Sequence, residues 1–172
     1  VVLLGSVTAL GGGSARDMML GNYPLGWVRE PYLLAVTSAA ALATIALSPV
    51  IHRFRSLFLV LDAIGLVAFT IVGCDVALKG AQHPAIVIVA GMITGCVGGV
   101  LRDVLCNDVP LLFRSELYAS VAVVTGLIYV IGLRIGFHPD VVTAAALATG
   151  LAFRLLAIRY HWEMPKFVYQ RD

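Results

Sequence analysis

Long runs of apolar residues, separated by short polar stretches, dominate the chain. Each run has roughly 18 or more residues, the length that crosses a hydrocarbon core of about 30 Å as a helix. The stretches between them contain proline, which ends a helix in its interior. The pattern therefore predicts an all-α membrane protein. The predicted spans are a first helix that ends near Leu20 and helices over 31–50, 57–78, 84–106, 116–133 and 140–159.

The chain also contains an internal repeat with a spacing of 86 residues. The segment 11–17, Gly-Gly-Gly-Ser-Ala-Arg-Asp, returns at 97–103 as Val-Gly-Gly-Val-Leu-Arg-Asp. A duplicated apolar helix that carries charges and glycines is typical of the pathway of a transport protein. The same register continues through three later pairs: Pro24 and Pro110, Glu30 and Glu116, and Tyr32 and Tyr118.

The repeat predicts an inverted topology. The counterpart of 57–78 would fall before residue 1, so we expect one further helix there and seven in all. Three helices are an odd number, so the second repeat enters the membrane from the opposite face. The expected fold class is an inverted repeat of three transmembrane helices plus a seventh, with the first helix missing from this chain. We assign 1–50 to the rest of the first repeat, 57–133 to the second, and 140–172 to the final helix and a cytoplasmic tail.

Composition and charge support a multi-pass protein of the cell inner (plasma) membrane. Of the 172 residues, 60% are hydrophobic and 13% charged, too few polar groups to cover a soluble domain. No basic tract resembles a nucleic-acid site, so membrane lipids are the expected surroundings. Six loop cations against three put the C-terminus in the cytoplasm. The six are Arg53, Arg55, Arg114, Arg159, Lys166 and Arg171, and the three are Arg29, Lys79 and Arg134.

Consecutive glycines inside an apolar helix favour a break, and carbonyl oxygens at a break can replace part of the hydration shell of a cation. Threonine hydroxyls one turn earlier would add oxygen ligands. We therefore expect a monovalent cation near Gly12 and Gly99. The expected pathway residues of this kind are Thr8, Gly11, Gly12, Gly13, Thr94, Gly98 and Gly99. The remaining scattered glycines are expected to allow close helix packing.

An Arg-Asp pair follows each glycine cluster. Adjacent residues point about 100° apart on a helix, so Arg16 is not expected to pair well with Asp17, nor Arg102 with Asp103. Symmetry suggests the crossed pairs Arg16 with Asp103 and Arg102 with Asp17. The alternative is that both pairs lie in the headgroup zone and extend toward water. If buried, the arginines would act as gates and the carboxylates would bind the ion.

Other candidate chemistry is sparse. Asp62 is a possible accessory pathway residue, although a capping or solvated role is equally compatible with its place near a span end. The sequence has no nucleophile-base-acid set, phosphate loop or metal-ligand spacing, so we expect neither an enzyme nor a cofactor. Cys74, Cys96 and Cys106 are expected to be small core residues of helices.

The doubled motif, together with the stretch 57–66 (Leu-Phe-Leu-Val-Leu-Asp-Ala-Ile-Gly-Leu), resembles the bacterial branch of the trimeric intracellular cation (TRIC) channels. Bacterial sequences of this kind have also been labelled glycine transporters. The resemblance implies a homotrimer with a pore for K⁺ or Na⁺ in each protomer. It also implies two helices kinked at their glycines, here Gly11–Gly13 and Gly98–Gly99. Val97 replaces the first glycine, so the two half-sites differ, and the basic residues of animal members have no counterpart between Asp62 and Asp75.

The sequence is therefore compatible with two functions. One is a monovalent cation channel whose pore passes between two glycine-broken helices. The other is a secondary transporter of a small amino acid such as glycine, because paired helix ends and Arg-Asp pairs match both charges of a zwitterion.

Overall fold

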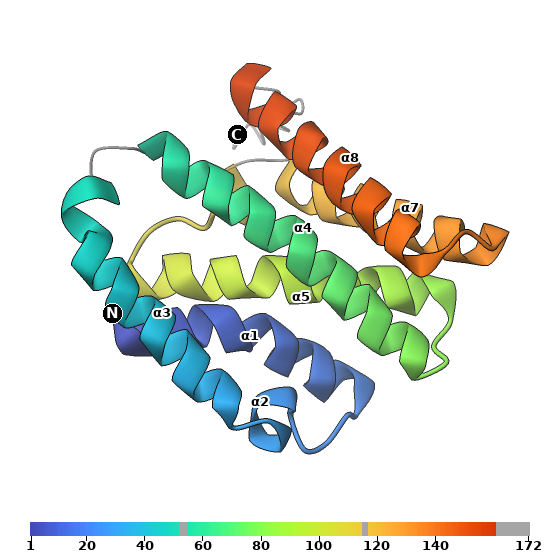
Figure 1. The fold of residues 1–172 in the computed structure, drawn as a ribbon, viewed down its shortest axis with the longest axis horizontal. Helices are drawn as coiled ribbons and strands as arrows, with labels where there is room; N and C mark the ends of the chain where they lie inside the picture. Colours follow the sequence, from blue (N-terminus) through green and yellow to red (C-terminus); the bar gives the residue numbers. More distant parts are fainter. Residues whose placement is uncertain (52–54, 115–116, 161–172) are drawn as a thin grey trace, which may run out of the picture.

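A computed structural model describes residues 1–51, 55–114 and 117–160. These residues form eight helices, six long and two of about one turn (Figure 1). The long helices agree with the predicted spans within a few residues at each end. They are α1 (Val2–Leu20), α3 (Tyr32–Ile51), α4 (Arg55–Lys79), α5 (Pro84–Leu105), α7 (Leu117–Ile135) and α8 (Pro139–Tyr160), and the short ones are α2 (Gly26–Arg29) and α6 (Leu111–Arg114).

Local sequence sets the helix ends. α1 ends at Gly21, which adopts a left-handed φ of 70° and donates its N–H to the Met18 carbonyl. α5 begins after His83, whose ring nitrogen accepts the Ala85 N–H at 3.3 Å, and its first residue is Pro84. These are the turn residues that the sequence pattern singled out.

The helix lengths and compositions fit a multi-pass membrane protein. Among the described residues, four stretches are long and apolar enough to cross a membrane: Leu57–Lys79, Pro84–Leu105, Leu117–Ile135 and Pro139–Tyr160. Tyr32–Ala46 is a shorter apolar stretch. α1 is not one of these stretches, and it contains three consecutive glycines, Arg16 and Asp17.

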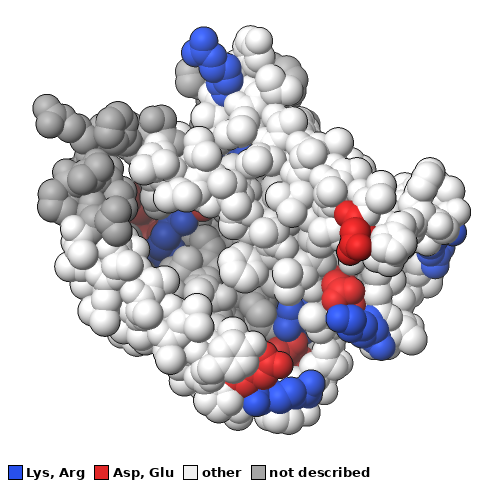
Figure 2. All heavy atoms as spheres, in the orientation of Figure 1, with Lys and Arg blue, Asp and Glu red and all other residues white. Residues whose placement is uncertain are grey.

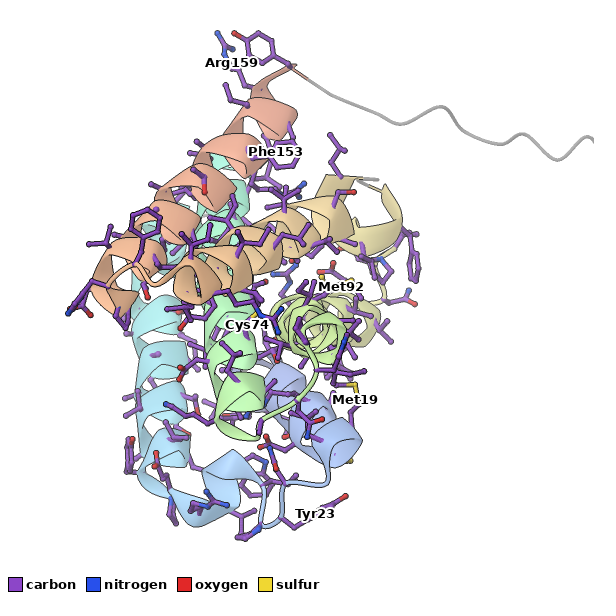
Figure 3. The ribbon with its side chains drawn as sticks, turned by 90° about the vertical axis from the view of Figure 1, so that its right-hand side faces the viewer. Met19, Tyr23, Cys74, Met92, Phe153 and Arg159 are labelled. Carbon is purple, nitrogen blue, oxygen red and sulfur yellow. The ribbon has the colours of Figure 1, made fainter. Side chains whose placement is uncertain are left out.

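α5 lies at the centre of the bundle. It packs against α1, α4 and α7, while α8 packs on α4 and α7 and α3 lies beside α1 (Figure 1). Small residues bring α4 and α5 close together, since a Cβ on Gly91 would overlap the Cys74 sulfur and one on Gly95 would lie 2.7 Å from the Leu66 carbonyl oxygen. Figure 3 shows Cys74 in this interior and Arg159 at the far end of α8.

A reciprocal contact supports the inverted repeat. A Cβ on Gly12 of α1 would overlap the Thr94 carbonyl of α5, and a Cβ on Gly98 would overlap the Thr8 carbonyl. The two contacts exchange residues that are 86 apart, as a two-fold axis requires. The residue number rises along α1 as it falls along α5, so the helices are antiparallel and the axis is perpendicular to them. The expected fold class is thus confirmed for the helices that the structure describes.

Two local expectations were wrong. α1 continues as a helix through Gly11–Gly13, and α5 through Gly98–Gly99, so neither helix is broken at its glycines. The glycines keep the helical hydrogen bonding of the backbone. Because they have no side chains, they allow α1 and α5 to approach closely. Cys74 and Cys96 are buried as expected, but Cys106 follows the last turn of α5 and is exposed.

Part of the expected topology lies outside the described residues. The tail that begins at His161 and the loop cation Arg53 belong to this part, as do Lys166 and Arg171. The side of the membrane on which the C-terminus lies therefore stays a prediction.

Candidate functional site

Each Arg-Asp pair of the repeat forms a local ion pair. Arg16 donates from Nε and Nη2 to Asp17 Oδ1, at 2.9 and 2.7 Å. Arg102 donates from Nε to Asp103 Oδ1 at 2.8 Å, and its Nη2 lies 2.8 Å from the same oxygen. Arg16, Asp17 and Asp103 are buried. The charges therefore compensate one another inside the protein, as buried charges require.

The crossed pairs Arg16–Asp103 and Arg102–Asp17 were wrong. Although adjacent residues point about 100° apart on a helix, the arginine side chain is long enough for its guanidinium to fold back onto the next residue. Each aspartate is also fixed from the other side by a backbone group. The buried alternative nevertheless fits better than the headgroup alternative, since the side chain of Arg16 is only 9% exposed.

The second oxygen of each aspartate holds the segment that follows the helix. Asp17 Oδ2 accepts the N–H of Gly26, the first residue of α2, at 3.0 Å. Asp103 Oδ2 accepts the N–H of Leu111, the first residue of α6, at 2.8 Å. A carboxylate at a helix N-terminus satisfies an otherwise unpaired N–H and interacts favourably with the helix dipole. The repeat thus duplicates a link between a long helix and a short one.

Arg102 has a second carboxylate partner, Asp62 of α4. Arg102 Nη1 donates to Asp62 Oδ1 at 2.7 Å, and the Tyr118 hydroxyl donates to the same oxygen at 3.4 Å. The side chain of Asp62 is 4% exposed. Its other oxygen, Oδ2, is buried and has no hydrogen-bond partner among the described residues. Asp62 is therefore a buried charged group, neither a cap nor a solvated surface residue.

Aromatic rings complete this cluster. The Arg102 guanidinium lies 4.7 Å from the ring centre of Phe58, and the Arg154 guanidinium 4.7 Å from that of Tyr118. These distances are typical of cation–π contacts. Arg154 is 2% exposed. The expected pathway set omitted Phe58, Tyr118 and Arg154, although the repeat register at Tyr118 and the charge of Arg154 within an apolar run were available signals.

A cavity of about 400 Å³ opens beside Asp62. It lies between α1, α3, α4 and α5, with Tyr118 of α7 in its wall, and most of its lining is apolar. Figure 2 shows the face of Figure 1 largely free of charged side chains, with blue and red atoms meeting inside a recess. Six of the expected pathway and accessory residues line the cavity: Thr8, Asp62, Thr94, Gly98, Gly99 and Arg102.

The other expected site residues lie elsewhere. Gly11 lines a smaller cavity of about 270 Å³ beside α2 and α3. Gly12 faces the Thr94 carbonyl at the crossing of α1 and α5. Gly13, Arg16, Asp17 and Asp103 are absent from the described lining of the large cavity. Five of the expected residues in the large cavity thus come from the second repeat, and only Thr8 comes from the first.

The threonine hydroxyls have intrahelical partners. Thr8 donates to the Leu4 carbonyl at 2.8 Å and Thr94 to the Ala90 carbonyl at 2.6 Å. This bond is common for threonine in apolar helices. It uses the hydroxyl hydrogen and leaves the oxygen able to accept.

The chemistry of the site is therefore limited to charge and hydrogen bonding. The described residues contain no cluster of three or more His, Cys, Asp or Glu side chains that could hold a metal ion. Asp62 offers a carboxylate to a cation in the cavity, and Arg102 offers a guanidinium to an anionic group.

Comparison with known proteins points to one family. A model of the family described as "Glycine transporter" matches residues 1–49 and 59–134. The Escherichia coli K12 UPF0126 inner membrane protein YadS is 36% identical over 169 residues, which cover 97% of this chain and 82% of that protein. A UPF0126 membrane protein of Vibrio cholerae is also 36% identical, over 97% of this chain and 70% of its own.

Solved structures of channels share the fold. A structure described as "Structural basis for conductance through TRIC cation channels" superposes with a TM-score of 0.88 at 32% identity, over 99% of this chain and 84% of that chain. The TRIC trimeric intracellular cation channel orthologue from Rhodobacter sphaeroides gives a TM-score of 0.86 at 32% identity, over 94% and 83%. Both are described as channels, not as enzymes.

Proposed function

This chain belongs to the family described as "Glycine transporter", and we propose that it is a monovalent cation channel with a pore in each protomer. The observation that carries the proposal is its likeness to solved TRIC cation channels over 94% or more of its length.

The pore passes through the cavity between α1 and α5. Thr8, Gly98 and Gly99 lie in the wall of this cavity and add no bulky side chains to it. K⁺ or Na⁺ is the permeant ion and no cofactor is required. The functional unit is a homotrimer in the inner membrane with its C-terminus in the cytoplasm. The trimer is supported by the description of the Rhodobacter sphaeroides channel as trimeric.

A secondary transporter of glycine is the second candidate. The cavity contains both a carboxylate, Asp62, and a guanidinium, Arg102, and a zwitterion needs partners of both signs. Against it, these two groups are paired with each other at 2.7 Å. Ion permeation through a channel does not require Asp62 and Arg102 to separate fully, and we therefore prefer the channel.

The decisive experiment measures both activities on one preparation. Full-length protein in liposomes is assayed for K⁺ flux and for uptake of labelled glycine. We expect fast K⁺ flux that does not saturate and no glycine movement. Saturable glycine uptake with negligible K⁺ flux would establish the transporter instead.

Gly65→Leu tests whether the cavity is the pore. Gly65 lines the cavity, and a Cβ there would have no atom within 4 Å, so a leucine fills the space without disturbing the helices. We expect K⁺ flux to fall by about tenfold or more, since a narrowed apolar constriction excludes hydrated ions. Val72→Phe is the matched control, because it adds the same number of carbon atoms on α4 at an exposed position outside the cavity lining. Equal flux in both folded variants would place the pore elsewhere.

A further inference from the structure

The buried oxygen Asp62 Oδ2 lacks a hydrogen-bond partner among the described residues. A buried carboxylate oxygen without a partner costs free energy, and such groups usually have an ion or water beside them. Here the other oxygen, Oδ1, is fully engaged by Arg102 and Tyr118. Oδ2 has no hydrogen-bond partner among the described residues, and Asp62 lies in the wall of the cavity.

We propose that Asp62 is the cation ligand of this cavity and that its Oδ2 atom makes the pathway select cations over anions. A carboxylate oxygen is a hard ligand that suits K⁺ and Na⁺, and the apolar walls around it strengthen its attraction for a cation. Thr94, Gly98 and Gly99 lie in the same wall and surround the ion with small groups.

Arg102 makes the site weak enough to release the ion. Its guanidinium donates to Asp62 through Nη1 and to Asp103 through Nε. Its Nη2 lies 2.8 Å from Asp103 Oδ1 but has no hydrogen-bond partner among the described residues. Asp62 therefore shares its charge between a fixed cation and a mobile one. Conduction needs an ion site of this kind, favourable enough to enter and weak enough to leave.

A direct test of binding uses the wild-type protein. Crystals of the full-length protein grown with Tl⁺ in place of K⁺ are examined for anomalous scattering. We expect a Tl⁺ peak in contact with Asp62 Oδ2. Absence of a peak at Asp62, with Tl⁺ bound at another place in the pathway, would overturn the proposal. This test does not depend on the folding of any variant.

Asp62→Asn tests selectivity, and Asp75→Asn is its control. Asp75 is also on α4, but its side chain is 41% exposed and pairs with Lys79 at 2.6 Å. In planar bilayers under a KCl gradient, we expect Asp62→Asn to lower the K⁺/Cl⁻ permeability ratio by about tenfold, the effect of losing one contact to a charged group. Asp75→Asn should retain the wild-type ratio. Asp62→Glu keeps the charge and should recover most of the selectivity.

The selectivity test rests on the proposed channel function, but the role of Asp62 and the channel function can fail separately. A wild-type protein that binds Tl⁺ at Asp62 but passes no K⁺ current would refute the channel and retain the site. A K⁺ current whose selectivity is equal in wild type, Asp62→Asn and Asp75→Asn would retain the channel and refute the role of Asp62.

Discussion

Among single residues, matching positions of the repeat have different surroundings. Gly12 and Gly98 are equivalent, and both allow α1 and α5 to touch backbone to backbone. Gly13 and Gly99 are not equivalent, because a Cβ on Gly99 would lie 2.9 Å from the Tyr118 hydroxyl whereas one on Gly13 would lie 3.8 Å from Arg16 Nη2. The sequence motif predicts that these positions matter, but only the packing shows what each one accommodates.

Gly12→Ala should destabilise the protein, whereas Gly13→Ala should not. The added methyl group of the first variant meets a backbone carbonyl, which cannot rotate away as a side chain can. We expect a loss of about 1–3 kcal/mol, the usual cost of overpacking. The adjacent Gly13→Ala has ordinary contacts and should gain about 0.5–1 kcal/mol from better helix propensity. Denaturation of both variants in the same detergent checks this, and equal midpoints would contradict the assigned helix crossing.

Between elements, the repeated aspartates connect each long helix to the short helix that follows. Asp17 and Asp103 divide their two oxygens in the same way, one to the preceding arginine and one to a backbone N–H. The proline and glycine positions of these loops were sufficient to predict turns. The anchors were not predictable from spacing, because they depend on the direction in which the chain leaves the helix.

Asp17→Ala should cost about 3–5 kcal/mol in unfolding free energy, because it leaves Arg16 buried without its partner and α2 without its anchor. Asp75→Ala removes a carboxylate from an exposed pair with Lys79 and should change stability little. Thermal denaturation of the purified variants measures the difference. If the two variants melted together, Asp17 would have no special role.

At the scale of the whole molecule, the described helices of the inverted repeat pack around the central helix α5, and α8 packs on α4 and α7. An interior that contains Asp62, Arg102, Asp103 and Arg154 is unusual for a membrane protein unless those charges serve a pathway. The expected orientation follows from loop cations and can be tested on the wild-type protein.

The three native cysteines report the orientation. Cys106 is exposed at the end of α5, and Cys74 and Cys96 are buried. The loop after α5 also contains Arg114, one of the cations assigned to the cytoplasmic side. A membrane-impermeant maleimide should therefore label Cys106 in inside-out vesicles and not in intact cells. Cys106→Ser should abolish this labelling, whereas labelling of Cys106 in intact cells would invert the topology.

The sequence by itself determined the helices, the repeat and the family resemblance. Apolar length sets the spans, proline and glycine set their ends, and an odd number of helices per repeat sets the inversion. These features depend on residues that are near one another in the chain or related by a constant spacing.

The tertiary structure decided which charges meet and where the cavity lies. Arg102 contacts Asp62 across 40 positions of sequence, and Tyr118 joins them from a third helix. Such contacts depend on the rotation and crossing of packed helices, which periodicity does not fix. For the same reason the glycine clusters, expected as breaks, proved to be continuous helix held against its neighbour.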